Sequence, residues 1–270
     1  MQVVAQLNYL SPLREKPVAY LCEPPPGTPR ENHRYEARAV SITDARPAAS
    51  SFELDRDGFA LLRHRTGARD LGADDEVRRA YYPEAAELIR EATGATRVLV
   101  FDHAIRRRHP TRPQLSFGRD HATLQPVGRV HCDYTETSAP RRLAELLGEG
   151  FASLGDRRYC EVNLWRSLRH PVLDVPLAVC ASWSAAPEDL VACEARYATR
   201  RGELYLATYS SKHRWFYFSA MAADDVLIFK GYDSRKTGAR FTLHSAFEHP
   251  GARDDAPLRQ SVELRAFALF

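Results

Sequence analysis

The sequence predicts a mainly β protein with an antiparallel sandwich or barrel at its centre. Beyond residue 96 the chain consists of short segments rich in valine, leucine and aromatic residues, separated by Gly, Pro, Asp and Ser. This spacing is typical of antiparallel strands joined by turns, whereas strands alternating with helices would indicate a parallel sheet. The length of 270 residues fits one domain of this class, spanning 1–270.

The first 95 residues are expected to flank this β core. Residues 1–50 are rich in proline and turn formers, so we expect an irregular arm with one or two short strands. In the mixed flank 51–95, "FELDRDGFALLRHRT" predicts a hairpin with its turn at Asp55–Gly58. "DDEVRRAYYPEAAELIREATG" predicts a helix that Asp74 or Asp75 caps and Gly94 ends.

The core itself is predicted over 96–270, with two helices among its strands. The helices are expected at 138–148, between Ser138 and Gly148, and at 186–198. The strands are expected at 96–106, 128–135, 158–168, 176–183, 202–210, 213–221, 225–233, 239–247 and 259–270. "RRRHPTR" (106–112) is interpreted as a solvated loop, with a lid over the site as the alternative.

Composition and charge limit the partners of the protein. The net charge is only +3, and the basic residues are spread along the chain, so we expect no nucleic-acid partner. The five cysteines include no CxxC pair, which argues against a disulfide framework and a thiolate zinc site. Neither a signal peptide nor an apolar run of about 20 residues is visible. We therefore expect a cytoplasmic protein that has no membrane partner; its oligomeric state stays open.

The segment "GRVHCDYTE" (128–136) carries the first candidate site. On a strand, His131 and Asp133 share one face and Cys132 lies on the other. The pair is either a hydrogen-bonded pair in the core or two ligands of a metal ion. On the last predicted strand Arg259, Ser261, Glu263 and Arg265 share a face. A buried cationic face of this kind requires an anionic partner.

The order H-x-D, then a later strand histidine, His244, then R-x-S at Arg259 and Ser261, resembles mononuclear iron oxygenases. Further blocks make the resemblance specific: "EVNLWRSL", "LHSAFEHP" and "RQSVELRAFALF". Together they resemble the Fe(II)/2-oxoglutarate-dependent hydroxylase/desaturase family that includes the CmcJ component of cephamycin methoxylation and the AsaB-like fungal enzymes. The resemblance covers roughly residues 50–270.

The resemblance implies a fold, cofactors and roles for residues. The core would be a double-stranded β-helix, or jelly roll, with flanking helices. The cofactors would be Fe(II), 2-oxoglutarate and O2, and the reaction would be hydroxylation, desaturation or oxidative ring formation on a small molecule of secondary metabolism. His131, Asp133 and His244 match the catalytic metal ligands. Arg259 and Ser261 match the pair that binds 2-oxoglutarate, with Asn163 and Arg166 as further residues of the site.

Alternatives remain at the level of residues and of function. His249 competes with His244 as the third ligand, and Arg265 competes with Arg259 for the co-substrate. A metal-dependent hydrolase or isomerase could use the same triad. A non-catalytic protein that binds small molecules could also keep the fold.

Overall fold

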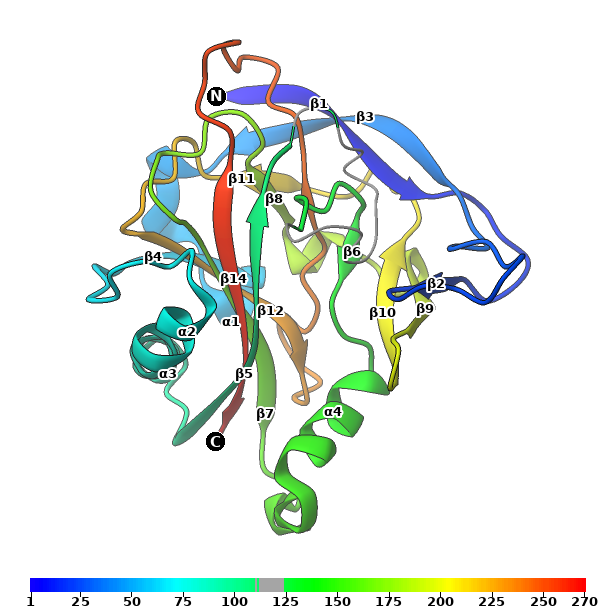
Figure 1. Cartoon of the computed structure of the whole chain (residues 1–270), viewed down its shortest axis with the longest axis vertical. Helices are drawn as coiled ribbons and strands as arrows, with labels where there is room; N and C mark the ends of the chain where they lie inside the picture. The colour runs from blue at the N-terminus through cyan, green and yellow to red at the C-terminus, as the bar shows by residue number, and fades with distance from the viewer. Residues whose placement is uncertain (110, 112–123) are drawn as a thin grey trace.

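Two mostly antiparallel sheets form the centre of the computed structural model, which describes residues 1–109, 111 and 124–270 (Figure 1). One sheet has five strands in the order β4-β12-β7-β14-β5. Its strands are β4 (Phe59–Arg63), β5 (Arg97–Arg107), β7 (Tyr159–Ser167), β12 (Asp225–Asp233) and β14 (Gln260–Leu269). The resulting mainly β, jelly-roll fold confirms the predicted fold class.

The other sheet has nine strands in the order β1-β3-β11-β8-β13-β6-β10-β9-β2. Its strands are β1 (Gln2–Leu10), β2 (Val18–Tyr20), β3 (Tyr35–Asp44), β6 (His131–Cys132), β8 (Leu177–Cys180), β9 (Leu190–Arg196), β10 (Arg201–Ala207), β11 (Trp215–Tyr217) and β13 (His244–Ala246). The short strands β6 and β13 are direct neighbours, and His131 pairs with His244 in their register. This pairing brings together two segments that are far apart in the sequence.

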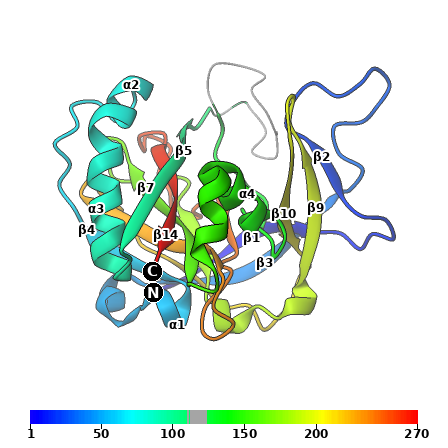
Figure 2. The same ribbon diagram turned by 90° about the horizontal axis from the view of Figure 1, so that it is seen from below.

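Strand β14, between β7 and β5, separates an apolar face of its sheet from a polar one. Val262 and Leu264 point to the outer face, where they pack in one cluster with Ile89 of α3 (Tyr82–Thr93). Figure 2 shows α3 along the outside of this sheet. The alternate residues, among them Arg259 and Arg265, lie on the inner face, as the period of two predicts. The site is therefore built on the inner face of the sheet.

The remaining helices cover the edges of the sheets. Before α3 the chain forms α2 (Asp74–Glu76) and a turn of π-helix (Val77–Tyr81). As predicted, Gly94 ends α3, and it does so with a left-handed φ of 72°. Among the described residues the chain also forms the α-helices α1 (Leu54–Asp57) and α4 (Ser138–Leu147), and α4 packs near the ends of β14 and β7 (Figure 2). No helix in the described ranges is long and apolar enough to cross a membrane.

Several expected elements differ from the structure. Residues 1–50 contain the two long paired strands β1 and β3 rather than a mainly irregular arm. Residues 186–198 contain one turn of 3-10 helix (Pro187–Asp189) and then strand β9 in place of the expected helix, because their apolar residues also alternate with period two and the segment pairs with β10. The expected hairpin in 51–65 is helix α1 followed by β4, and strand 128–135 shrinks to the two residues of β6. The proposed loop or lid at 106–112 lies partly outside the described residues.

Candidate functional site

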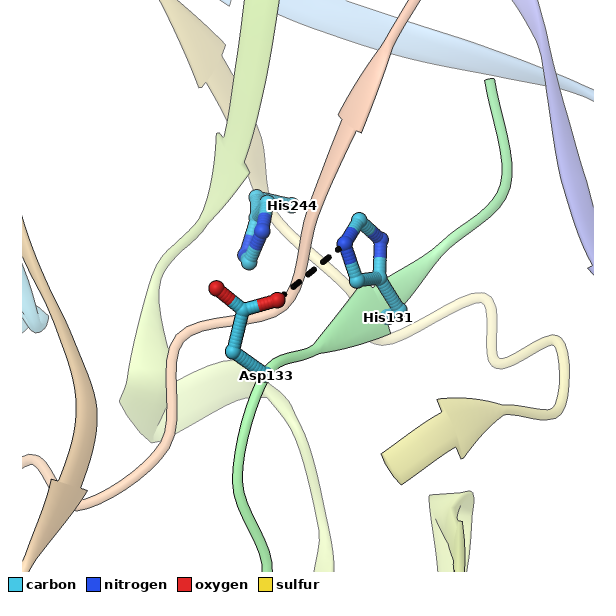
Figure 3. Close-up of side chains that lie close together, drawn as sticks. All are labelled: His131, Asp133 and His244. Carbon is cyan, nitrogen blue, oxygen red and sulfur yellow. Dashed lines mark ion pairs between the residues drawn. The ribbon is translucent and has the colours of Figure 1, made fainter. Parts of the chain in front are cut away.

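His131, Asp133 and His244 form a compact cluster between the sheets. One potential ligand atom from each residue lies within 4.8 Å of the others. His131 Nε2 is 3.6 Å from Asp133 Oδ1, and the centres of the two imidazole rings are 4.2 Å apart. Figure 3 shows the three side chains pointing toward one another. Among the described residues, these three are the group of His, Cys, Asp or Glu side chains whose ligand atoms lie close enough together to hold one metal ion.

Backbone carbonyls fix the orientation of both imidazoles. His131 Nδ1 lies 2.9 Å from Arg129 O, and His244 Nδ1 lies 3.1 Å from Thr242 O. Because a carbonyl only accepts, each Nδ1 carries a proton, and in the neutral form of such a ring Nε2 keeps the free lone pair. The buried Nε2 of His244 has no hydrogen-bond partner among the described residues. Two imidazole nitrogens and one carboxylate oxygen are a donor set that suits Fe(II).

The carboxylate of Asp133 is held by its second oxygen. Oδ2 accepts hydrogen bonds from Asn163 Nδ2 at 2.8 Å and from Arg265 Nε at 2.7 Å, which leaves Oδ1 facing His131. Burial would raise the pKa of Asp133, but the Arg265 guanidinium and the two imidazoles hold it well below its usual range. Burial and the neighbouring His244 lower the pKa of His131. Asp133 is thus an anion and the His131 ring is neutral, the forms in which these two groups bind a metal.

Arg265 and His249, the two rival residues, have other partners. Arg265 also pairs with Asp102 Oδ2 at 3.2 Å and with Glu263, so three carboxylates surround its guanidinium. This leaves it a role in orienting Asp133. His249 Nε2 lies 3.1 Å from the hydroxyl of Tyr217 and does not join the cluster of His131.

Arg259 is a buried cation in a different setting. Its Nη1 donates to Val175 O at 3.0 Å, its Nε lies 3.2 Å from Ser261 Oγ, and its guanidinium lies 4.9 Å from the centre of the Trp165 ring. Burial lowers its pKa to about 9, so it stays charged at neutral pH. Among the residues that the structure describes, no carboxylate forms an ion pair with it. A buried cation of this kind fits the carboxylate of a ligand.

Arg166 does not belong to this site. Asn163 and Arg166 lie on opposite faces of β7, and the Arg166 guanidinium packs over the Tyr81 ring on the helix-covered side. Its Nε donates to Ala223 O at 2.9 Å and its Nη2 to His64 O at 3.0 Å. The expectation that Arg166 lines the site is therefore corrected, because the strand period sends it to the other face.

Asn163 contacts the site, but through Asp133 and not through an open space for the co-substrate. Neither its hydrogen bond nor that of Arg265 was predicted from the sequence. The shared face of Arg259 and Arg265 on the last strand was a usable signal. Two arginines on one buried face need anionic partners, and the carboxylate of Asp133 was one candidate partner in the sequence.

Comparisons with known proteins give one consistent result. Residues 7–269 match the family model described as "Oxidoreductase/YMDC permease-like domain". The chain is 33% identical over 253 residues to the Fe(II)/2-oxoglutarate-dependent dioxygenase nvfI of Aspergillus novofumigatus, covering 91% of this chain and 88% of the relative. It is 32% identical over 257 residues to the hydroxylase/desaturase efuI of Hormonema carpetanum, covering 88% and 85%.

The fold agrees with these relatives. The solved structure of the iron and alpha-ketoglutarate-dependent endoperoxidase NvfI superposes with a TM-score of 0.89 at 28% identity, covering 99% of this chain and 98% of that one. These relatives are all named as oxidising enzymes, which favours the oxygenase over the hydrolase, isomerase and non-catalytic alternatives. The chain belongs to the family of non-haem Fe(II)- and 2-oxoglutarate-dependent dioxygenases.

Proposed function

We propose that His131, Asp133 and His244 bind the catalytic iron and that Arg259, with Ser261, binds the distal carboxylate of 2-oxoglutarate. The observation that carries the proposal is the convergence of the three ligand atoms within 4.8 Å. The hydrogen bonds of both Nδ1 atoms and of Asp133 Oδ2 support it, because they orient the three side chains. The two Nε2 atoms and Oδ1 are left to face a common metal position. The unpaired buried charge of Arg259 supports the second part.

The residues around these groups position the reactants and exclude water. Iron in such a site supplies the activation of dioxygen, with 2-oxoglutarate as co-substrate. Trp165 packs against the guanidinium of Arg259, and Phe229 packs against His244 with ring centres 4.7 Å apart. Both aromatic rings belong to one buried apolar cluster. An anchored carboxylate in a dry environment binds its cation more strongly than it would in water.

The substrate is proposed to be a small molecule of secondary metabolism. A cavity of about 780 Å³, within the range of small-molecule sites, is lined by His131 and Asp133 among others. The relatives named hydroxylase/desaturase and endoperoxidase favour oxidation of an unactivated C–H bond, by hydroxylation, desaturation or ring formation. We further propose that residues 1–270 act as one domain, because both sheets combine strands from the two halves of the chain.

An anaerobic titration tests the assignment. Adding Fe(II) and then 2-oxoglutarate should produce the visible charge-transfer band of a chelated 2-oxo acid. His131→Ala should abolish metal binding, whereas Arg259→Gln should keep metal binding and weaken 2-oxoglutarate binding. The exposed Arg253→Gln serves as a matched arginine control. If Arg259→Gln chelated 2-oxoglutarate as tightly as the wild type, the co-substrate assignment would fail. Under air and with substrate, release of succinate should follow.

A further inference from the structure

The cavity beside the triad is rich in arginine. Its described lining contains eight arginines and five carboxylates. Each of these carboxylates already has a partner: Asp102 and Asp133 contact Arg265, Glu145 contacts Arg142, Glu203 contacts Lys16, and Glu23 contacts Arg30. With eight guanidinium groups against five carboxylates, the described lining carries three more positive than negative charges. An anionic ligand group would complement it.

Among the arginines that line the cavity, Arg106 lies beside β14, the strand that carries Ser261. It sits on β5 opposite Ser261 of β14, on the inner face of the sheet. Its Nη1 donates to Gln125 O at 3.0 Å, and within the described ranges its guanidinium forms no ion pair. Glu263, a carboxylate of the same inner face, is held by Arg265. Arg106 thus keeps donors that no described carboxylate uses.

Gln125 adds a second unused donor at the same place. It is only 7% exposed, and its Oε1 accepts a hydrogen bond from the backbone N–H of His109 at 2.9 Å. Its amide nitrogen Nε2 is buried and has no partner among the described residues. Buried polar atoms without partners are uncommon, and each needs an explanation such as a bound water, an ion or a group of a ligand. Gln125 and Arg106 both line the cavity, and the side chain of each has N–H donors for which no described carboxylate is a partner.

We propose that Arg106 and Gln125 bind a carboxylate of the substrate, so that this oxygenase acts on a carboxylic acid. The planar fork of a guanidinium matches a carboxylate at two points, and the amide of Gln125 can donate to the same group. The co-substrate is anchored separately, because Arg259 is not among the residues that line this cavity. The inference rests on the proposed function of the triad and adds the class of its substrate.

A matched pair of ligands tests this inference. The probes are abietate, a tricyclic carboxylate of a size that suits the cavity, and its methyl ester, which lacks the charge. Each is titrated by calorimetry into protein loaded with Fe(II) and 2-oxoglutarate without oxygen. The charge-transfer band is recorded on the same samples, so failure of the proposed function shows as loss of the band in the wild type.

The wild type should bind the acid at least about tenfold more tightly than the ester, as expected for one charge-assisted contact. Arg106→Gln should remove this preference and leave the band unchanged. Arg141→Gln, an exposed arginine of the same cavity, should keep the preference. Gln125→Leu should weaken binding of the acid and not of the ester.

Three outcomes would overturn the inference. Equal binding of acid and ester by the wild type is one, and binding of neither probe at millimolar concentration with the band intact is another. The third is loss of 2-oxoglutarate chelation in Arg106→Gln, which would make Arg106 a co-substrate residue. If Arg106→Gln does not fold, Arg106→Lys retains the charge without the fork, and the acid-to-ester comparison in the wild type still decides.

Discussion

At the scale of single residues, Asp133 is where the contacts of the site converge. Asn163 and Arg265, both on the five-stranded sheet, hold one oxygen of a carboxylate that follows β6 of the other sheet. Arg265 keeps the carboxylate ionised, and both partners fix its direction. Residues that orient a ligand in this way contribute to metal affinity without touching the metal.

Asn163→Leu should therefore weaken metal binding by about 10- to 100-fold, because Asp133 keeps Arg265 but loses the amide donor. Titration with Co(II), whose visible spectrum reports the ligand set, measures the change. 2-Oxoglutarate affinity of the fully metal-loaded variant should change much less. Unchanged Co(II) affinity would contradict a positioning role for Asn163.

Arg166 provides the opposite case, a buried arginine with a structural role. Its guanidinium ties the carbonyls of Ala223 and His64 to β7 on the face away from the triad. Arg166→Met should lower the free energy of unfolding by about 2–3 kcal/mol, the usual value for lost hydrogen bonds to a charged group. Urea denaturation measures this loss. 2-Oxoglutarate binding by the folded variant should stay at the wild-type level, and a selective loss of that binding would return Arg166 to the site.

At the scale of elements, the bounds of strands were predicted best where turn residues flank the strand. Strand β12 has the predicted bounds, 225–233, and β14 lies within the predicted 259–270. Strand β9 was missed because "LVACEAR" is compatible with a helical stripe as well as with alternation. The pairing of β1 with β3 was missed because long-range register leaves little local signal. The triad came from the family resemblance, since H-x-D alone is a common pattern.

The irregularity in β12 allows one close approach that the sequence did not reveal. The pairing register of β12 with β7 shifts at Gly231, and a Cβ there would lie 1.9 Å from Glu161 Oε2. The carboxyl group of Glu161 is fully buried, and its oxygens have no partner in the described part of the chain. Burial and the charge of Asp133 raise its pKa. Glycine at 231 makes the space that this carboxyl occupies.

Gly231→Ala should thus destabilise the protein by about 1–3 kcal/mol through overpacking. Combining it with Glu161→Ala should recover part of that loss, because the clashing carboxyl is gone. A double-mutant cycle of unfolding free energies measures the coupling. Strictly additive effects would show that Gly231 and Glu161 do not share this space. Gly150→Ala, where an added Cβ meets no atom within 4 Å, is the control.

At the scale of the whole molecule, the N-terminal strands are part of the body and not an appendage. In the segment that connects β2 and β3, His33 Nε2 lies 3.4 Å from Glu31 Oε2. Glu31 also forms an isolated β-bridge with Ala19 of β2. Burial raises the pKa of Glu31 to about 7, and Arg129, two residues before His131, opposes this shift. The arm is thereby electrostatically linked to the segment that carries the first ligands.

The raised pKa of Glu31 predicts how stability depends on pH. The folded state favours the protonated carboxyl, so the contribution of Glu31 is fully present below its ordinary value of 4.5. It is lost as the pH rises toward about 7. The side chain in Glu31→Gln is neutral at every pH. The unfolding free energy of this variant, relative to that of the wild type, should therefore rise between about pH 5 and about pH 8. Urea denaturation at both values measures this. A pH-independent difference would contradict the assignment, and Glu15→Gln on the same arm is the control.

Because the site is divided between the two sheets, we expect metal binding to influence how fast the protein is degraded in a cell. The nine-stranded sheet supplies the proposed iron ligands, and the five-stranded sheet supplies Arg259, Ser261 and the partners of Asp133. In the proposed site, bound iron and 2-oxoglutarate would join the sheets, and their binding energy would add to the stability of the folded state. In an iron-starved cell, we expect proteases to remove the metal-free chain faster. Iron supply would then set the amount of this enzyme as well as its turnover rate.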